Sequence, residues 1–199
     1  MNDHANGAKN PLAMFRNTLK PGGFANAPVV APPVNLFDGA PEADGAAALI
    51  LVPADRAADM APRPVRVAGS AVATDSLALH DRVDPLCLSA ANLSAGRACG
   101  MAGITPNDID LFELHDAFTI MAALSLEASG FAERGRGVRL AEEGEITLEG
   151  RVPIATMGGL KARGHPVGAT GVYQVVEATL QLQGLAGANQ VQDANIAMA

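Results

Sequence analysis

The second half of the sequence alternates short apolar runs with longer segments of helical spacing. The apolar runs are short enough for strands, and two of the helical segments end at Gly130 and Gly184, residues able to adopt the left-handed conformation that ends a helix. This alternation favours an α/β fold of packed layers in which the strands run mainly parallel. The predicted strands and helices are, in chain order, 109–114, 117–129, 152–156, 169–183 and 195–199.

Prolines divide the first half, which carries fewer regular patterns. Apolar runs predict two strands, of which the first is expected to be buried on both faces. A further helix of small residues ends at Gly103, and a capped turn follows it at 105–108. Pro62 and Pro64 mark the expected boundary between two units, 1–62 and 63–199. The predicted elements are a brief helix over 10–15, strands over 46–52 and 65–73, and helices over 55–60 and 91–102.

The segment 132–151 is rich in glutamate and arginine and shows little periodicity. Such a segment is typical of a solvated excursion over the protein surface. We therefore expect it to contribute little to the core.

Composition excludes several classes of protein. Of the 199 residues, 49% are apolar and 18% charged, which argues against disorder. The 14 Lys and Arg against 21 Asp and Glu give a net charge of −7, so nucleic acid is not an expected partner. Neither a membrane span nor a secretory signal is visible, and we expect a cytoplasmic protein. Cys87 and Cys99 lack the paired spacing of a disulfide framework or a zinc site, so no metal is predicted.

Two histidines stand at junctions between a predicted strand and a predicted helix. His115 follows the run 109–114, and His165 lies in the glycine-rich segment 157–171. The carboxyl ends of parallel strands meet at one edge of a sheet, where ligands bind in open α/β folds. We therefore expect both histidines to face one cleft.

The segment 157–171 has the composition of a tightly bent loop. Pro166 fixes its own φ and disfavours a helical conformation at His165, so the imidazole is carried on a stiff support. The alternative is a tight connection whose histidine merely packs. No Gly-Lys-Ser or Gly-Lys-Thr closes a phosphate-binding loop, although Lys161 and Arg163 could attract an anion.

Five segments in this order resemble the thiolases, and most closely the branch of sterol carrier protein x and the archaeal acetoacetyl-CoA thiolases. Members of this branch carry His-Asp-Cys-Phe or His-Asp-Ala-Phe where other thiolases have Asn-Glu-Ala-Phe. The resemblance implies a layered, thiolase-like α/β fold: residues 1–62 would be the end of the N-terminal half with its loop region, and residues 63–199 the C-terminal domain, truncated at its last strands. The matching segments are Asn10–Phe15, Asp44–Ala48, His115–Phe118, Gly158–Gly159 and Gly164–Gly171.

The resemblance also implies roles for individual residues. His165 would help to activate the nucleophilic cysteine and would donate a hydrogen bond to the thioester oxygen. His115 stands where the other branch has the Asn that supports this oxyanion hole. Neutral imidazoles can stabilise an enolate in this way. The resemblance implies supporting roles for Asp116, Gly164 and Pro166, and substrate contacts for Gly158, Gly159 and Met157.

The sequence departs from the family pattern in three places. The nucleophilic cysteine of thiolases lies in the N-terminal half, upstream of the first residue here. Cys87 and Cys99 are not expected to replace it, because both are predicted to be small buried hydrophobic residues. The third position of His-Asp-Cys-Phe is Ala117, so the cysteine that acts as acid and base has no counterpart. The segment Ala155–Met157 replaces the Asn-Pro-Ser of many relatives, which affects the expected substrate contacts.

The expected function is that of an acetyl-CoA acetyltransferase type of thiolase, which forms or cleaves a 3-oxoacyl-CoA with a coenzyme A thioester as substrate and no bound cofactor. This chain would lack the half that holds the nucleophile. The alternative is a non-catalytic subunit that binds CoA thioesters or acts as a scaffold, and a third possibility is the product of a broken gene. Expected partners are an acyl-CoA, a second copy or a complementary thiolase half, and a small OB-fold protein like the one that accompanies archaeal thiolases.

Overall fold

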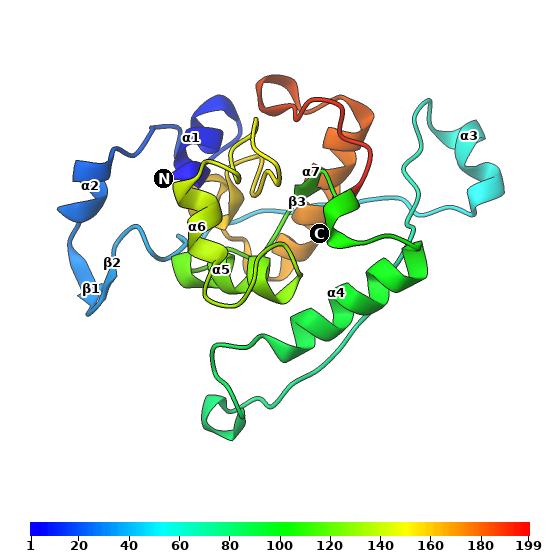
Figure 1. Cartoon of the computed structure of the whole chain (residues 1–199). Coiled ribbons are helices and arrows are strands. Elements are labelled where there is room, and N and C mark those ends of the chain that lie inside the picture. The colour runs from blue at the N-terminus through cyan, green and yellow to red at the C-terminus, as the bar shows by residue number, and fades with distance from the viewer.

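The computed structural model describes all residues, 1–199, as a packed body and a peripheral arm, which we define as residues 44–88. Figure 1 shows the arm, in cyan, leaving the body, passing through α3 and returning to α4. The α-helices and strands are α1 (Asn2–Lys9), α2 (Pro21–Ala25), β1 (Val29–Ala31), β2 (Val34–Asn35), α3 (Ala57–Met60), α4 (Ser89–Ala102), β3 (Leu111–Phe112), α5 (Thr119–Ala128), α6 (Gly137–Glu142), α7 (Thr170–Gln183) and β4 (Ala197–Met198). Short turns of helix are η1 (Ala54–Arg56), η2 (Leu79–Asp81), η3 (Pro106–Asp108), η4 (Gly159–Arg163), η5 (Val167–Ala169) and η6 (Gly187–Asn189). No helix is long and apolar enough to span a membrane.

The predicted strands of the second half meet in a short parallel arrangement. β3 pairs in parallel with β4, with Leu111 opposite Ala197, and Phe112 forms a parallel bridge with Ile154 on its other side. The strands are shorter than predicted, but the backbone pairing continues at one end, where the Asp110 N–H donates to the Ile196 carbonyl at 2.9 Å. The layered α/β arrangement is therefore confirmed.

The longer helices α4, α5 and α7 lie close to where the periodicity predicts them. α4 ends at Gly103 with φ of 71°, and α7 ends at Gly184 with φ of 73°, both in the left-handed region. The turn η3 carries the predicted cap, in which Thr105 and Asp108 bond reciprocally. These boundaries depend on local chemistry, which is why the sequence predicts them well.

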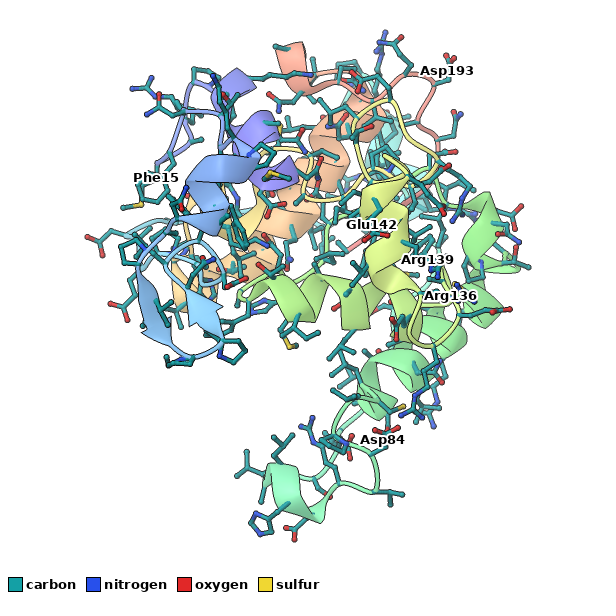
Figure 2. All side chains as sticks on the ribbon, turned by 60° about the vertical axis from the view of Figure 1, so that its left-hand side comes forward. Phe15, Asp84, Arg136, Arg139, Glu142 and Asp193 are labelled. Atoms are coloured by element: carbon teal, nitrogen blue, oxygen red, sulfur yellow. The ribbon has the colours of Figure 1, made fainter.

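The core lies between β3, α5 and the chain that follows α5. It contains eleven buried residues: Cys99, Ile109, Phe112, Leu114, Leu126, Phe131, Leu140, Ile146, Val152, Ile154 and Ala155. The prediction that 132–151 is only a solvated excursion is wrong in this respect. Most of its charged residues are exposed, including Arg136, Arg139 and Glu142 at α6 in Figure 2, but Leu140 and Ile146 turn inward.

The N-terminal helix is displaced from its predicted position. The brief helix expected over 10–15 is absent, and α1 covers Asn2–Lys9 instead. The Asn10 side chain explains this end point: it accepts the N–H of Leu12 at 2.9 Å and donates to the Met157 carbonyl at 2.9 Å. Local bonds of this kind compete with a helix and favour a turn.

The two strands predicted in the arm are not formed. Residues 46–52 and 65–73 are extended, but no neighbouring strand bonds to them, and Ile50, Leu51 and Val72 are 84%, 75% and 83% exposed. The short helix predicted between them is confirmed by η1 and α3. The predicted division near residue 62 falls inside this arm and stays a prediction.

The face of α7 that is buried is not its apolar stripe. The apolar stripe that includes Val172 and Val175 is exposed, with 36% and 40% of these residues accessible. The buried face is polar: it consists of Thr170, Gln174, Glu177, Ala178 and Gln181. Three of these side chains are partners for polar side chains before α7: Thr170 for His165, Glu177 for Arg163 and Gln181 for Thr156.

Candidate functional site

The rings of His115 and His165 lie side by side. Their centroids are 5.2 Å apart, and the ring planes meet at 82°. His115 lies three residues after the end of β3, whereas His165 follows η4 and precedes α7. The predicted convergence of the two histidines is thus observed, and their chemical roles stay predictions.

A strap of chain, residues 38–43, holds the two histidine loops together. On one side the Ala40 N–H donates to the Ala117 carbonyl at 2.8 Å. On the other side the His165 N–H donates to the Pro41 carbonyl at 3.1 Å, and the Ala43 N–H donates to the His165 carbonyl at 3.4 Å. The sequence analysis missed this strap, because backbone pairing leaves no signature in its side chains.

The imidazole of His165 is oriented by a hydroxyl group. Its Nδ1 lies 2.7 Å from Oγ1 of Thr170, the first residue of α7. The predicted support from Pro166 lies at the start of the turn η5, where the next residue, Val167, has φ of 33°. A β-branched residue rarely adopts this conformation, so the loop is held in shape by its surroundings.

The surroundings of His115 favour its neutral form. Burial lowers its pKa from the usual 6.5, and the neighbouring charge of His165 lowers it further. An imidazole that stays neutral near pH 7 keeps one N–H donor and one acceptor. In this arrangement the two rings lie close enough to direct N–H donors toward a single oxygen atom.

Asp116, which the sequence predicts as a supporting residue, is fully buried behind the histidines. Its Oδ1 accepts the N–H of Leu160 at 2.9 Å, whereas its Oδ2 has no hydrogen-bond partner. Burial raises its pKa from 3.8 to about 7; the charge of Asp3 adds to this shift, and Lys161 opposes it. Asp116 therefore fastens the loop that carries His165 to the loop that carries His115.

Glu113 makes a second link of the same kind, which the sequence analysis missed. Its Oε1 accepts the N–H of Thr156 at 3.0 Å and also the Thr156 hydroxyl. Burial raises the pKa of Glu113 above its usual value. The signal available in the sequence was a charged residue inside a predicted buried strand, since such a residue requires a partner.

The two cations of the glycine-rich loop are not available for an external anion, which corrects the expectation for Lys161 and Arg163. Lys161 Nζ lies 2.9 Å from Asp3 of α1, and Arg163 Nε lies 2.9 Å from Glu177 of α7. Burial alone would lower the pKa of Lys161, but the charges of Asp3 and Asp116 raise it above its usual value. Each cation therefore anchors the loop to a helix.

The glycines of this loop are close to other atoms. A Cβ on Gly159 would lie 2.5 Å from Oδ2 of Asp116, and one on Gly158 would lie 2.9 Å from Cα of Gly7 in α1. Gly164 has φ of 116° and lies against Ala43 of the strap. These contacts favour a role in shaping the loop, and the substrate contacts predicted for Gly158, Gly159 and the half-buried Met157 stay predictions.

A buried polar network under the loop was also missed. Gln181 Nε2 donates to both Thr156 Oγ1 and the Asn189 carbonyl at 2.8 Å, and Asn189 Nδ2 donates to the carbonyls of Asn6 and Thr156 at 2.8 Å. The residues come from three distant parts of the chain. Only the tertiary structure could bring them together.

Neither cysteine belongs to the histidine pair. Cys99 is part of the hydrophobic core, and burial raises the pKa of its thiol, with Asp108 adding to the shift. Cys87 is exposed at the end of the peripheral arm, which corrects the expectation that it is buried. No three His, Cys, Asp or Glu side chains are grouped so that they could hold a metal ion.

The chain is similar to known proteins in both sequence and structure. The family model described as "Thiolase C-terminal domain-like" matches residues 71–199. An acetyl-CoA acetyltransferase of Methanothermobacter thermautotrophicus is 45% identical, and the match covers 98% of this chain and 51% of the relative. Human sterol carrier protein 2 is 32% identical, and the match covers 98% of this chain and 37% of the relative. Among solved structures, a chain of the Ltp2-ChsH2(DUF35) aldolase has a TM-score of 0.89 at 24% identity and covers 98% of this chain and 52% of its own. This chain thus spans about half the length, or less, of the proteins it matches.

Proposed function

The chain belongs to the thiolase family, and we propose that it supplies the two-histidine half of an acetyl-CoA acetyltransferase type of site, which forms or cleaves a 3-oxoacyl-CoA. The observation that carries the proposal is the pairing of His115 and His165, whose ring centroids are 5.2 Å apart. The substrate would be a coenzyme A thioester. The predicted cytoplasmic location stays a prediction.

The proposed chemistry depends on stabilising a negative oxygen. A Claisen condensation between thioesters passes through an enolate, and N–H donors fixed in advance toward its oxygen lower its energy. His165, oriented by Thr170, would donate directly to this oxygen. His115, whose pKa is lowered by burial and by His165, would remain neutral and assist from the adjacent position.

The covalent step requires a thiolate, which neither Cys87 nor Cys99 is placed to provide. A raised pKa disfavours the thiolate form of Cys99. In our proposal, the acyl group is carried by a cysteine of the other thiolase half. This chain would then hold the acyl-enzyme carbonyl and not form the acyl-enzyme itself.

The test is reconstitution of activity. The chain is mixed with a separately produced N-terminal thiolase half that carries the nucleophilic cysteine, and thiolysis of acetoacetyl-CoA is measured. His165→Ala should lower kcat by about a hundredfold or more, the loss expected for one oxyanion donor, and His115→Ala by less. His80→Ala is the matched control, because His80 is exposed in the peripheral arm.

Two outcomes would contradict the proposal. One is turnover that is unaffected by His165→Ala in a folded complex. The other is turnover by the chain alone that disappears on mutation of Cys87 or Cys99, which would place the nucleophile in this chain.

A second candidate is a non-catalytic subunit that binds a CoA thioester or acts as a scaffold. The peripheral arm favours it, because Ile50, Leu51 and Val72 expose apolar surface that a partner would cover. The partner could be a second copy, a complementary thiolase half or a small OB-fold protein. Size-exclusion chromatography with each, together with acyl-CoA binding in the absence of turnover, distinguishes this candidate from the first.

A further inference from the structure

Thr170 is a buried residue whose hydroxyl group contacts the ring of His165. It is the first residue of α7, and only 1% of it is accessible to solvent. Its Oγ1 lies 2.7 Å from Nδ1 of His165. This distance is typical of a strong hydrogen bond between a hydroxyl group and a ring nitrogen.

The direction of this bond follows from the surroundings of the hydroxyl. A threonine in a helix commonly donates to the carbonyl four residues earlier, as Thr179 does to Val175 at 2.7 Å. The Thr170 hydroxyl makes no such bond, and its side-chain partner is His165. If Nδ1 carried a proton, the buried hydroxyl proton would have no acceptor, which is unfavourable.

We infer that Thr170 is a positioning residue that donates to Nδ1 of His165 and so holds this imidazole in the tautomer with its proton on Nε2. A neutral imidazole has one donor and one acceptor nitrogen, so occupation of Nδ1 as the acceptor makes Nε2 the donor. The N–H then lies on the side of the ring opposite Thr170.

The placement of the backbone supports this assignment. The strap fixes the backbone of His165 by two hydrogen bonds. The His165 N–H donates to the Pro41 carbonyl, and the His165 carbonyl accepts the N–H of Ala43. With the His165 backbone held, the imidazole ring can still rotate, and the hydrogen bond to Thr170 restrains this rotation. In the proposed function, on which the catalytic meaning of this inference rests, the Nε2–H is the donor to the thioester oxygen.

The tautomer can be measured directly by NMR of the full chain with ¹⁵N-labelled histidine. The chain has four histidines, so the His165 signals are identified from their loss in His165→Asn. In the neutral form we expect an unprotonated Nδ1, a protonated Nε2 and a Thr170 hydroxyl proton that correlates with Nδ1. Thr170→Val, which keeps the shape but removes the hydroxyl, should give a mixture of tautomers, and Thr170→Ser should restore the wild-type pattern.

A protonated Nδ1 in the neutral wild-type ring overturns the inference, as does a folded Thr170→Val variant with an unchanged tautomer. If Thr170→Val does not fold, the wild-type spectrum decides: a hydroxyl proton correlated with Nδ1 supports the inference, and its absence overturns it. In the reconstituted enzyme, Thr170→Val should lower kcat by about tenfold or more with little change in KM, and Thr170→Ser should recover it. If no reconstituted mixture turns over, the proposed function fails, whereas the tautomer assignment is still judged by NMR.

Discussion

The Oδ1 atom of Asp116 accepts the backbone N–H of Leu160 at 2.9 Å, so the residue next to His115 holds the loop that carries His165. The bond joins two parts of the chain 44 residues apart. Because Asp116 is completely buried, its carboxyl group is costly to ionise, and its pKa is raised to about 7 although the bond from Leu160 opposes the shift.

This link predicts a pH dependence of stability. Asp116 has a pKa of about 7 in the folded chain, against 3.8 when unperturbed. From about pH 4 to 7 the folded chain therefore binds more protons than the unfolded chain, and stability falls as pH rises through this range. Asp116→Asn imitates the protonated group, so it should match the wild type near pH 4 and exceed it by about 2 to 4 kcal/mol at pH 8.

Urea unfolding of both proteins at several pH values measures this difference. The comparison of the two curves is essential, because Glu113 and Glu177 also have raised pKa values and contribute to the wild-type slope. Parallel curves for wild type and Asp116→Asn would contradict the prediction.

Gly159→Ala should destabilise the chain severely. The new Cβ would lie 2.5 Å from Asp116 Oδ2 and 2.7 Å from Ala155 Cβ, at a φ of 55°. The expected loss is about 3 kcal/mol or more. Gly168→Ala is the matched control in the same loop, because no atom lies within 4 Å of the added carbon, and it should change stability by less than about 0.5 kcal/mol. Thermal unfolding measures both, and equal effects would contradict the assigned packing.

The ion pair of Asp3 with Lys161 should matter far more than one on the surface. Asp3→Asn leaves the buried Lys161 without its nearest counter-charge and should cost about 3 to 5 kcal/mol. Glu149→Gln breaks the pair with Lys9, in which the side chains are 79% and 43% exposed, and should cost less than about 0.5 kcal/mol. Chemical denaturation of both variants provides the test, and a small effect of Asp3→Asn would show that Lys161 is not held by this pair.

The titration of His115 should respond to its neighbour. Its pKa is lowered first by burial and then by the charge of His165. His165→Gln removes that charge while keeping a polar side chain, so the pKa of His115 should rise but stay below 6.5, because the burial remains. NMR titration of the His115 ring protons measures the shift. An unchanged value would mean that the two rings do not interact in solution.

Several elements could be predicted from the sequence alone because their determinants are local. α4 and α7 end at glycines that take left-handed conformations, and the cap of η3 is encoded within four residues. The meeting of His115 and His165 was also predicted, from the shared edge of parallel strands, but His165 follows the helical turn η4 and is joined to the His115 loop through the strap.

Other elements depend on neighbours that a sequence pattern does not identify. The apolar runs 46–52 and 65–73 have strand-like composition, but a strand forms only where another strand accepts its hydrogen bonds. The stripe of valines on α7 is exposed, and the polar stripe is the one that meets the glycine-rich loop, where Glu177 pairs with Arg163.

The sequence by itself therefore determined the family resemblance, the helix ends and the two histidines, all of which follow from short stretches of chain. The tertiary structure alone decided which charges are buried and paired: Asp3 with Lys161, Glu113 with Thr156, and Asp116 with Leu160. The physical reason is that a buried charge is tolerated only beside a partner, and each of these partners is distant in the chain. Their contacts exist only after the loop and the helices have packed together.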